Sequence, residues 1–256
     1  MEAYRLHATD GEMGKVQSLY FDDEKWVVRY VSVDTRKWLP GRHVLLSPTS
    51  FKKVDTNNKE IKVASDKETV RESPSLEESE SFTYSRELAL TNYWGWTPYW
   101  SGAYLWGSQN TLTPNAPVTA TDTDKATQEA EGSEKDRESI SDEVRHELKE
   151  TAEMQEQFII HANDGKIGRI DDFLIDSENW KIRYLVISSG EEFPENYYYL
   201  SPDWIQSMDW VDDNAYIDVN KEIIKNGPGY SEKIDVTRTH EQELYTSYRK
   251  PAYWER

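Results

Sequence analysis

Two segments of this chain repeat each other without a gap. Residues 7–74 and 161–228 align at a constant offset of 154, and 18 of the 68 aligned pairs are identical. The longest matches are H-A-T-D-G-E-M-G at 7–14 with H-A-N-D-G-K-I-G at 161–168, and W-V-V-R-Y at 26–30 with W-K-I-R-Y at 180–184. A match of this length in one register indicates two copies of one structural unit. A residue that the fold needs should occur in both copies, whereas a residue that serves one site need not.

The repeat predicts two small domains, each followed by its own tail. After each copy the sequence reaches a Glu-Leu pair, at 87–88 and 243–244, and ends in Pro and aromatic residues. We therefore expect barrels over 1–74 and 157–228, with helical and aromatic tails over 75–106 and 229–256.

The connector over 107–156 reads as an acidic, flexible linker. Residues 122–156 carry 13 acids against 5 bases, and Thr, Pro, Ser and Gly are frequent before them. Such a composition predicts disorder over 107–138. A good N-cap at Ser141 with helix formers behind it predicts a helix over 140–155.

Each copy predicts a set of short antiparallel strands. Asp-Gly at 10–11 is a hairpin signal, and the segments around it are rich in β-branched and aromatic residues. Five or six short strands in about 70 residues favour a small closed barrel, and closure removes exposed strand edges. Ser47 and Ser201 each precede a proline, which is typical of a helix N-cap. The expected strands are 3–8, 14–21, 26–34, 43–46, 51–54 and 60–64 in copy one, and 157–162, 168–175, 180–188, 197–200, 205–208 and 216–219 in copy two.

This pattern resembles the PRC-barrel family. The resemblance lies in a Gly-Lys-Val or Gly-Arg-Ile strand, an acidic turn, a Trp-x-x-Arg-Tyr strand and a Leu-Ser-Pro element, and it covers both copies. The family includes the cytoplasmic domain of the photosynthetic reaction-centre H subunit and the C-terminal domain of a ribosome-maturation factor. The resemblance implies a mainly β protein with two small antiparallel PRC-like barrels that dock onto larger assemblies. Residues 1–256 show no counterpart of the N-terminal membrane helix of the H subunit, so we do not expect a direct photosynthetic role.

Composition excludes several function classes. The chain has no cysteine, which removes disulfides, thiol catalysis and thiolate metal sites. A formal net charge of −18 repels a phosphate backbone, so we expect no nucleic-acid partner. The first residues do not resemble a secretory signal, and no apolar run is long enough to cross a membrane as a helix. We expect a cytoplasmic protein, with peripheral membrane contact left open.

No set of polar residues predicts catalysis, a cofactor or a metal. His7 and His161 occupy matched places, where ancestry explains them better than chemistry. The acidic clusters lack the spacing of a calcium loop. Arg29 and Arg183 recur with two matched acids, at 22 or 24 in copy one (Asp22, Glu24) and at 176 or 178 in copy two (Asp176, Glu178). Either acid predicts an exposed cross-strand ion pair that sets the strand register.

The aromatic tails are the candidate functional residues. Trp and Tyr supply large contact areas and are enriched where proteins meet partners, but they also cover the flank of a small barrel. We expect the rings of each tail to pack on a barrel, with Trp100 and Trp254 substantially buried. The candidate partner-docking residues are Tyr93, Trp94, Trp96, Tyr99, Trp100, Tyr104, Trp106, Tyr253 and Trp254.

The sequence therefore predicts a non-enzymatic adaptor or scaffold that binds protein partners through its barrels and tails. The alternatives are an accessory protein of a photosynthetic or electron-transfer complex, or a binder of a small ligand held between barrels and aromatic residues. An enzyme is the least supported class, because no nucleophile and base occur in a recognisable arrangement.

Overall fold

The computed structural model describes residues 4–40, 42–74, 82–112, 148–155, 157–189, 197–229 and 236–255. The chain divides into two compact units. Unit 1 comprises Met1–Glu150 with Ser177–Lys181, and unit 2 comprises Thr151–Asp176 with Ile182–Arg256. Most of the predicted linker, residues 113–147, lies outside the described residues, as does the first half of the helix predicted over 140–155. Each unit is described by itself below.

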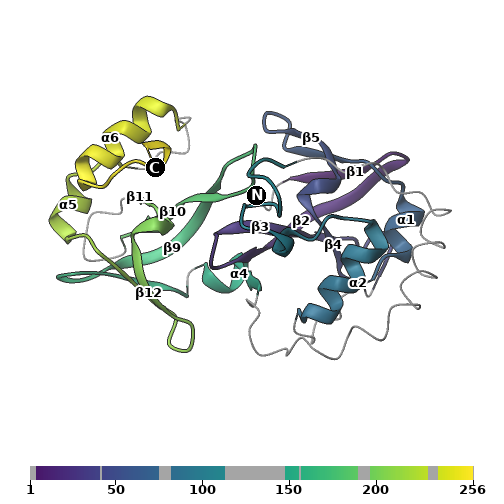
Figure 1. The fold of residues 1–256 in the computed structure, drawn as a ribbon, viewed down its shortest axis with the longest axis horizontal. Helices are drawn as coiled ribbons and strands as arrows, with labels where there is room; N and C mark the ends of the chain where they lie inside the picture. Colours follow the sequence, from purple (N-terminus) through teal and green to yellow (C-terminus); the bar gives the residue numbers. More distant parts are fainter. Residues whose placement is uncertain are drawn as a thin grey trace. The chain divides into compact units, whose positions relative to one another are not determined.

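Unit 1 is a mixed β-sheet with short helices (Figure 1). The strands follow the order β4-β3-β2-β1-β6-β5. The strands are β1 (Arg5–Ala8), β2 (Gly11–Asp22), β3 (Val27–Asp34), β4 (Val44–Leu46), β5 (Phe51–Asp55) and β6 (Glu60–Val63). The helices are α1 (Lys67–Glu72), α2 (Tyr84–Trp94) and the 3-10 turns η1 (Pro48–Ser50) and η2 (Tyr99–Ser101).

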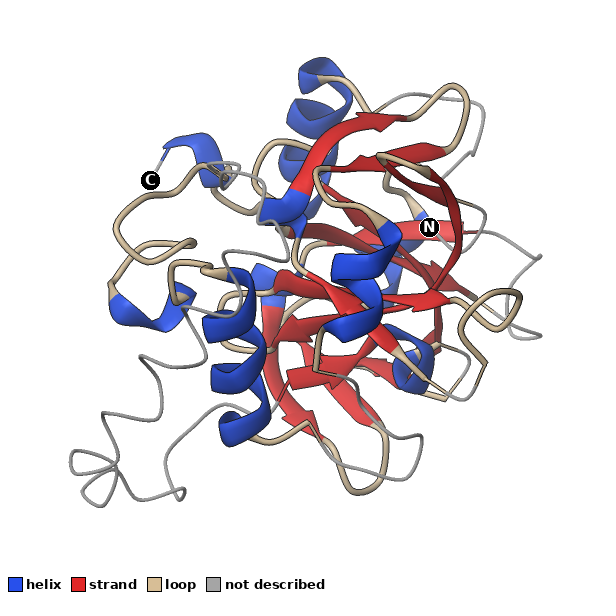
Figure 2. Ribbon diagram, turned by 90° about the vertical axis from the view of Figure 1, so that its right-hand side faces the viewer, coloured by secondary structure: helices blue, strands red, loops and turns tan. Residues whose placement is uncertain are grey.

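Unit 2 has the same strand order, β11-β10-β9-β8-β13-β12. Its strands and helices are coloured red and blue in Figure 2, as are those of unit 1. The strands are β8 (Ile159–Ala162), β9 (Gly165–Ile175), β10 (Ile182–Ser188), β11 (Tyr197–Leu200), β12 (Ile205–Asp209) and β13 (Asn214–Ile217). The helices are α4 (Thr151–Met154), α5 (Lys221–Lys225), α6 (Arg238–Tyr248), η6 (Pro202–Trp204) and η7 (Tyr253–Glu255).

The mainly β fold matches the expectation, but the sheets are not wholly antiparallel. β1 pairs with β6 in parallel, and β8 pairs with β13 in parallel. The reason lies in the Leu-Ser-Pro element. β4 and β5 are joined through η1 instead of a hairpin, so the chain keeps its direction there and β6 returns parallel to β1. The predicted caps are confirmed, since the Ser47 and Ser201 hydroxyls accept from the backbone N–H two residues on.

A second correction concerns residues 148–150, which the sequence placed in a helix. Leu148–Glu150 forms strand β7, antiparallel to Tyr20–Asp22 of β2, and α4 follows only at Thr151–Met154. An available sheet edge outweighs a weak helix preference, because pairing satisfies backbone groups that a short helix leaves open at its ends.

The matched glycines mark matched bulges. The β1–β2 register shifts beside Gly14, and the β8–β9 register shifts beside Gly168. A Cβ on Gly14 would lie 1.9 Å from the Asp34 carbonyl oxygen, and one on Gly168 would lie 1.9 Å from the Ser188 carbonyl oxygen. Both positions therefore require glycine for close backbone approach.

The two repeated tryptophans share an uncommon backbone conformation. Trp26 has φ of 56° and Trp180 has φ of 60°, each just before the strand that follows the acidic turn. Bulky side chains rarely adopt this left-handed region. Both rings are buried, and this burial stabilises a conformation that the backbone alone disfavours.

The constant offset of 154 continues through both tails. Helix α2 and helix α6 have matched bounds, and so do η2 and η7. Both helices end in a left-handed residue, Gly95 or Arg249. This register aligns Glu87 with Glu241, so the sequence-based pairing of Glu87 with Glu243 is wrong.

Among the described residues, no helix is both long enough and apolar enough to cross a membrane.

Candidate functional site

In unit 1 an arginine and an aspartate join the two strands of the β2–β3 hairpin. The Arg29 Nε and Nη2 groups donate to Asp22 Oδ2 at 3.0 and 2.5 Å. The side chains of Arg29 and Asp22 are 0% and 4% exposed. The sequence predicts a pair with Asp22 or Glu24, and the structure has it with Asp22. The expected exposure of the pair is wrong, because both side chains are buried. Removing one partner would leave an unpaired charge in the interior.

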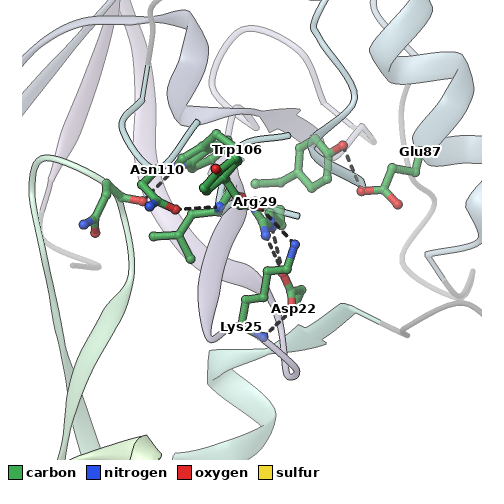
Figure 3. Close-up of polar contacts among 10 residues, drawn as sticks. Asp22, Lys25, Arg29, Glu87, Trp106 and Asn110 are labelled. Carbon is green, nitrogen blue, oxygen red and sulfur yellow. Dashed lines mark hydrogen bonds and ion pairs between the residues drawn. The ribbon is translucent and has the colours of Figure 1, made fainter. Parts of the chain in front are cut away.

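Two rings and a carbonyl surround the remainder of the Arg29 guanidinium. Its Cζ lies 3.8 Å from the Tyr99 ring centroid and 5.0 Å from that of Trp106, and Nη1 donates to the Leu105 carbonyl. Figure 3 labels Arg29 and Trp106. Cation–π contact and a charge-assisted hydrogen bond both favour this arrangement. The charge is therefore enclosed by protein.

A short folded loop supplies this carbonyl and the second ring. The Lys25 Nζ group donates to the Tyr104 carbonyl at 3.0 Å. The Leu105 N–H donates to Asn110 Oδ1 at 3.2 Å, and the Trp106 N–H donates to the Gln109 carbonyl at 2.8 Å. Figure 3 labels Lys25, Trp106 and Asn110 near Arg29. Residues 104–110 thus form a segment seated on the arginine, which we call the capping segment.

A glutamate from helix α2 lies beside this cluster. The Tyr30 hydroxyl donates to Glu87 Oε1 at 3.0 Å, and the Glu87 side chain also hydrogen-bonds Tyr99. Burial raises the pKa of Glu87 to about 7 against the counteracting hydrogen bonds. Burial also raises the pKa of the Tyr30 phenol well above its ordinary value. The Glu87 carboxyl therefore titrates near neutral pH.

Unit 2 repeats the arginine–aspartate pair at the same offset, with a more open surrounding. Arg183 Nε and Nη2 donate to Asp176 Oδ2 at 3.1 and 2.8 Å, and its Cζ lies 4.2 Å from the Tyr253 ring centroid. The two charged side chains are 17% and 21% exposed. This pair is therefore partly open to solvent where its counterpart is closed.

The glutamate of helix α6 repeats as well. Glu241 Oε1 accepts from the Tyr184 hydroxyl at 2.8 Å and from the Tyr253 hydroxyl at 3.1 Å. Unit 2 adds a cation, because Arg238 lies 2.8 Å from Glu241 Oε2 where unit 1 has Tyr84. Sequence reasoning did not identify the roles of Glu87, Glu241 and the two tail tyrosines. Extending the constant offset into the tails would have paired them.

Four of the candidate docking residues pack within unit 1. The Trp94 and Trp96 rings stack with centroids 5.4 Å apart and an interplanar angle of 6°. Both are buried, as is Trp106. The Tyr93 hydroxyl donates to the Thr69 carbonyl at 2.7 Å. These rings act as an intramolecular cover of the small sheet.

The other candidates in this tail lie nearer the surface. Tyr104 is 53% exposed, whereas Tyr99 and Trp100 are partly buried. The Trp100 ring contacts the Tyr84 ring edge-on at 5.6 Å. Tyr104 is thus the residue of this tail that offers the most ring surface to a partner.

In unit 2 both candidates are partly buried and contact cations. The Trp254 ring lies 4.1 Å from Arg238 Cζ and 5.3 Å from the Tyr245 ring. Tyr253 stacks on Arg183 as described above. Cations against partly exposed aromatic rings are a composition common at protein interfaces. The docking assignment of these residues stays a prediction.

The matched histidines have different neighbours. His7 Nε2 lies 3.7 Å from Glu60 Oε1, whereas His161 Nε2 hydrogen-bonds Asn214 Oδ1 at 2.7 Å and its ring stacks on Tyr216. Within the described part of the chain, no three His, Asp or Glu side chains gather as metal ligands would.

Comparison with known protein families identifies one domain. The model of the PRC-barrel domain matches residues 150–224, most of which lie in unit 2. The chain thus contains a PRC-barrel domain, formed by strands β8–β13 and their connections. No curated protein matches the chain significantly.

Proposed function

We propose that this chain is a non-enzymatic adaptor that binds protein partners through its barrels and aromatic tails. The observation that carries the proposal is the face of unit 2 where Tyr253 and Trp254 lie against Arg183 and Arg238. Partly exposed Tyr and Trp rings beside arginine are the side chains that most often dominate interface energies. Arg183 belongs to the PRC-barrel domain matched over residues 150–224.

The repeat supports a family assignment for unit 1. We propose that unit 1 is a second PRC-like barrel, because its strand order and its offset of 154 match those of unit 2. Similarity to the reaction-centre H subunit and to the ribosome-maturation factor supports docking onto a larger assembly. We place the protein in the cytoplasm, and its net charge of −18 argues against a nucleic-acid partner.

Affinity capture from the native source tests the adaptor function. The tagged full chain serves as bait beside a Tyr253→Ala/Trp254→Ala variant, with Trp210→Ala on the β12–β13 turn as a matched aromatic control. We expect a defined set of proteins that the wild type and the control enrich and that the tail variant loses. Equal recovery by all three baits, or no enriched protein, would remove the basis of the proposal.

The alternative is a small-ligand binder or an accessory protein of an electron-transfer complex. Rings against guanidinium groups also suit a flat ligand. The absorption spectrum of protein purified from the native source separates the two functions. Bands beyond those of Trp and Tyr that co-purify with the chain would favour the alternative.

A further inference from the structure

One difference between the two arginine sites is that a peptide segment of unit 1 packs on its arginine. The capping segment gives Arg29 a carbonyl from Leu105 and a ring from Trp106. In the described part of unit 2, both hydrogen bonds of Arg183 go to Asp176, and one ring, that of Tyr253, lies on its guanidinium.

Exposure follows the presence of the segment. The Arg29 and Asp22 side chains are 0% and 4% exposed, whereas those of Arg183 and Asp176 are 17% and 21% exposed. The pair geometry is otherwise the same, because in each unit Nε and Nη2 donate to one carboxylate oxygen. Among the described residues, unit 2 therefore has the same arginine–aspartate pair with more of its surface open to solvent.

We infer that the Arg183–Tyr253 face of unit 2 binds a short folded aromatic peptide segment from a protein partner in the way that the Arg29–Tyr99 face of unit 1 binds its own capping segment. The inference rests on the proposed function and names the class of partner. Arg183 Nη1 donates to a backbone carbonyl of the peptide, and the next side chain of the peptide, an aromatic ring, stacks on the guanidinium.

Three features favour a peptide with an aromatic side chain. The occupant of the matched site is such a peptide, with its carbonyl and its ring on consecutive residues, Leu105 and Trp106. Guanidinium donors recognise carbonyl oxygens, and the face of a Trp ring attracts a cation. Unit 2 also adds Arg238, 52% exposed, next to the same face, which increases its attraction for carbonyl oxygens.

The probe is a fluorescent peptide with the sequence of residues 102–111, titrated into the full chain and followed by anisotropy. We expect saturable binding of one peptide per chain. Arg183→Lys replaces the planar guanidinium and its several N–H donors with an ammonium group, and it should weaken binding at least tenfold. Arg36→Lys changes an 82% exposed arginine of unit 1 and should alter the affinity less than twofold. A peptide carrying Trp106→Ala should bind at least tenfold more weakly.

Two Tyr253 variants distinguish loss of the binding site from loss of the folded state. Tyr253→Phe keeps the ring under Arg183 and should retain binding, whereas Tyr253→Leu removes it and should lose binding. Circular dichroism melting of each variant checks that unit 2 remains folded. Binding that Arg183→Lys leaves unchanged would overturn the inference, because the peptide would then occupy another site. Absence of saturable binding would overturn it as well.

Two further outcomes distinguish failure of the peptide site from failure of the proposed adaptor function. Tail-dependent capture of partners without binding of the peptide would overturn the inference and leave the adaptor proposal standing. Self-association of the chain that Arg183→Lys abolishes, measured by sedimentation, would show that a second copy occupies the face and would overturn the assignment to a partner.

Discussion

At the residue scale, the matched arginine–aspartate pairs differ in energy because they differ in burial. Breaking a buried pair by removing one partner typically costs about 3–5 kcal/mol, whereas an exposed pair contributes about 0–1 kcal/mol. The Asp22–Arg29 pair belongs to the first class, and the partly open Asp176–Arg183 pair lies between the two classes.

Asp22→Ala should therefore lower the free energy of unfolding of unit 1 by about 3–5 kcal/mol. Asp176→Ala, the matched change in unit 2, should have a clearly smaller effect. Urea unfolding followed by tryptophan fluorescence measures both. Equal losses in the two variants would show that the capping segment does not change the energy of the pair.

The buried Glu87 should make unit 1 less stable as the pH rises. Its pKa is raised from 4.5 to about 7 on folding. The protonated carboxyl thus stabilises the fold below about pH 4.5, and this contribution is lost as the pH rises through about 7. Such a shift corresponds to about 3 kcal/mol.

Glu87→Gln should remove this loss between pH 5 and pH 8, since an amide stays neutral. The urea midpoint of the variant, compared with that of the wild type, should therefore increase with pH. At pH 8 the variant should unfold at the higher urea concentration. Glu241→Gln is the matched control, and it removes the partner of Arg238. A pH profile of Glu87→Gln that parallels the wild type would contradict the assignment.

At the element scale, the glycine bulges position the first hairpin of each unit. Gly14→Ala and Gly168→Ala would each place a Cβ 1.9 Å from a carbonyl oxygen, so the backbone must move. We expect destabilisation at or above the upper end of the usual 1–3 kcal/mol for overpacking. Gly95→Ala at the end of α2 is the control, because φ of +62° disfavours alanine but no atom lies within 4 Å. Thermal melts that rank Gly95→Ala with the other two would refute the close-approach explanation.

The tails are structural elements in their own right. Trp254 contacts Arg238 and Tyr245 and is partly buried, whereas the deepest rings of the tails are Trp94 and Tyr248. Full burial of a large side chain contributes about 1.5–3 kcal/mol, so Trp254→Ala should cost less than Tyr248→Ala. Differential scanning calorimetry compares the two melting temperatures. An unchanged melting temperature for Trp254→Ala would leave partner binding as the role of this ring.

At the scale of the whole molecule, the composition of the connector predicts where the chain is cut. Lys125, Lys135 and Arg137 lie within 107–138. Mild trypsin treatment should cut there first and yield two stable fragments. Mass spectrometry identifies the sites, and gel filtration shows whether the fragments separate. First cuts elsewhere would refute the predicted linker, and fragments that stay together would show that the two units form one body.

The sequence by itself determined the repeat, the β class, the matched glycines and the serine caps. These features depend on local rules, since glycine permits close backbone approach and a serine before proline caps a turn. An arginine–carboxylate pair was also predictable, because its residues are neighbours across one hairpin, but the choice between Asp22 and Glu24 was left to the structure.

Tertiary structure alone decided the remainder. The parallel β1–β6 pair and strand β7 arise between segments far apart in the chain, where pairing outweighs local preference. The same holds for Glu87, which meets Tyr30 across 57 residues, and for Leu105, whose carbonyl lies on Arg29 across 76 residues. Arg29 is more deeply buried than its copy Arg183 because the capping segment covers it. A sequence pattern does not show such a contact, because the energy of a charge depends on what the fold places around it.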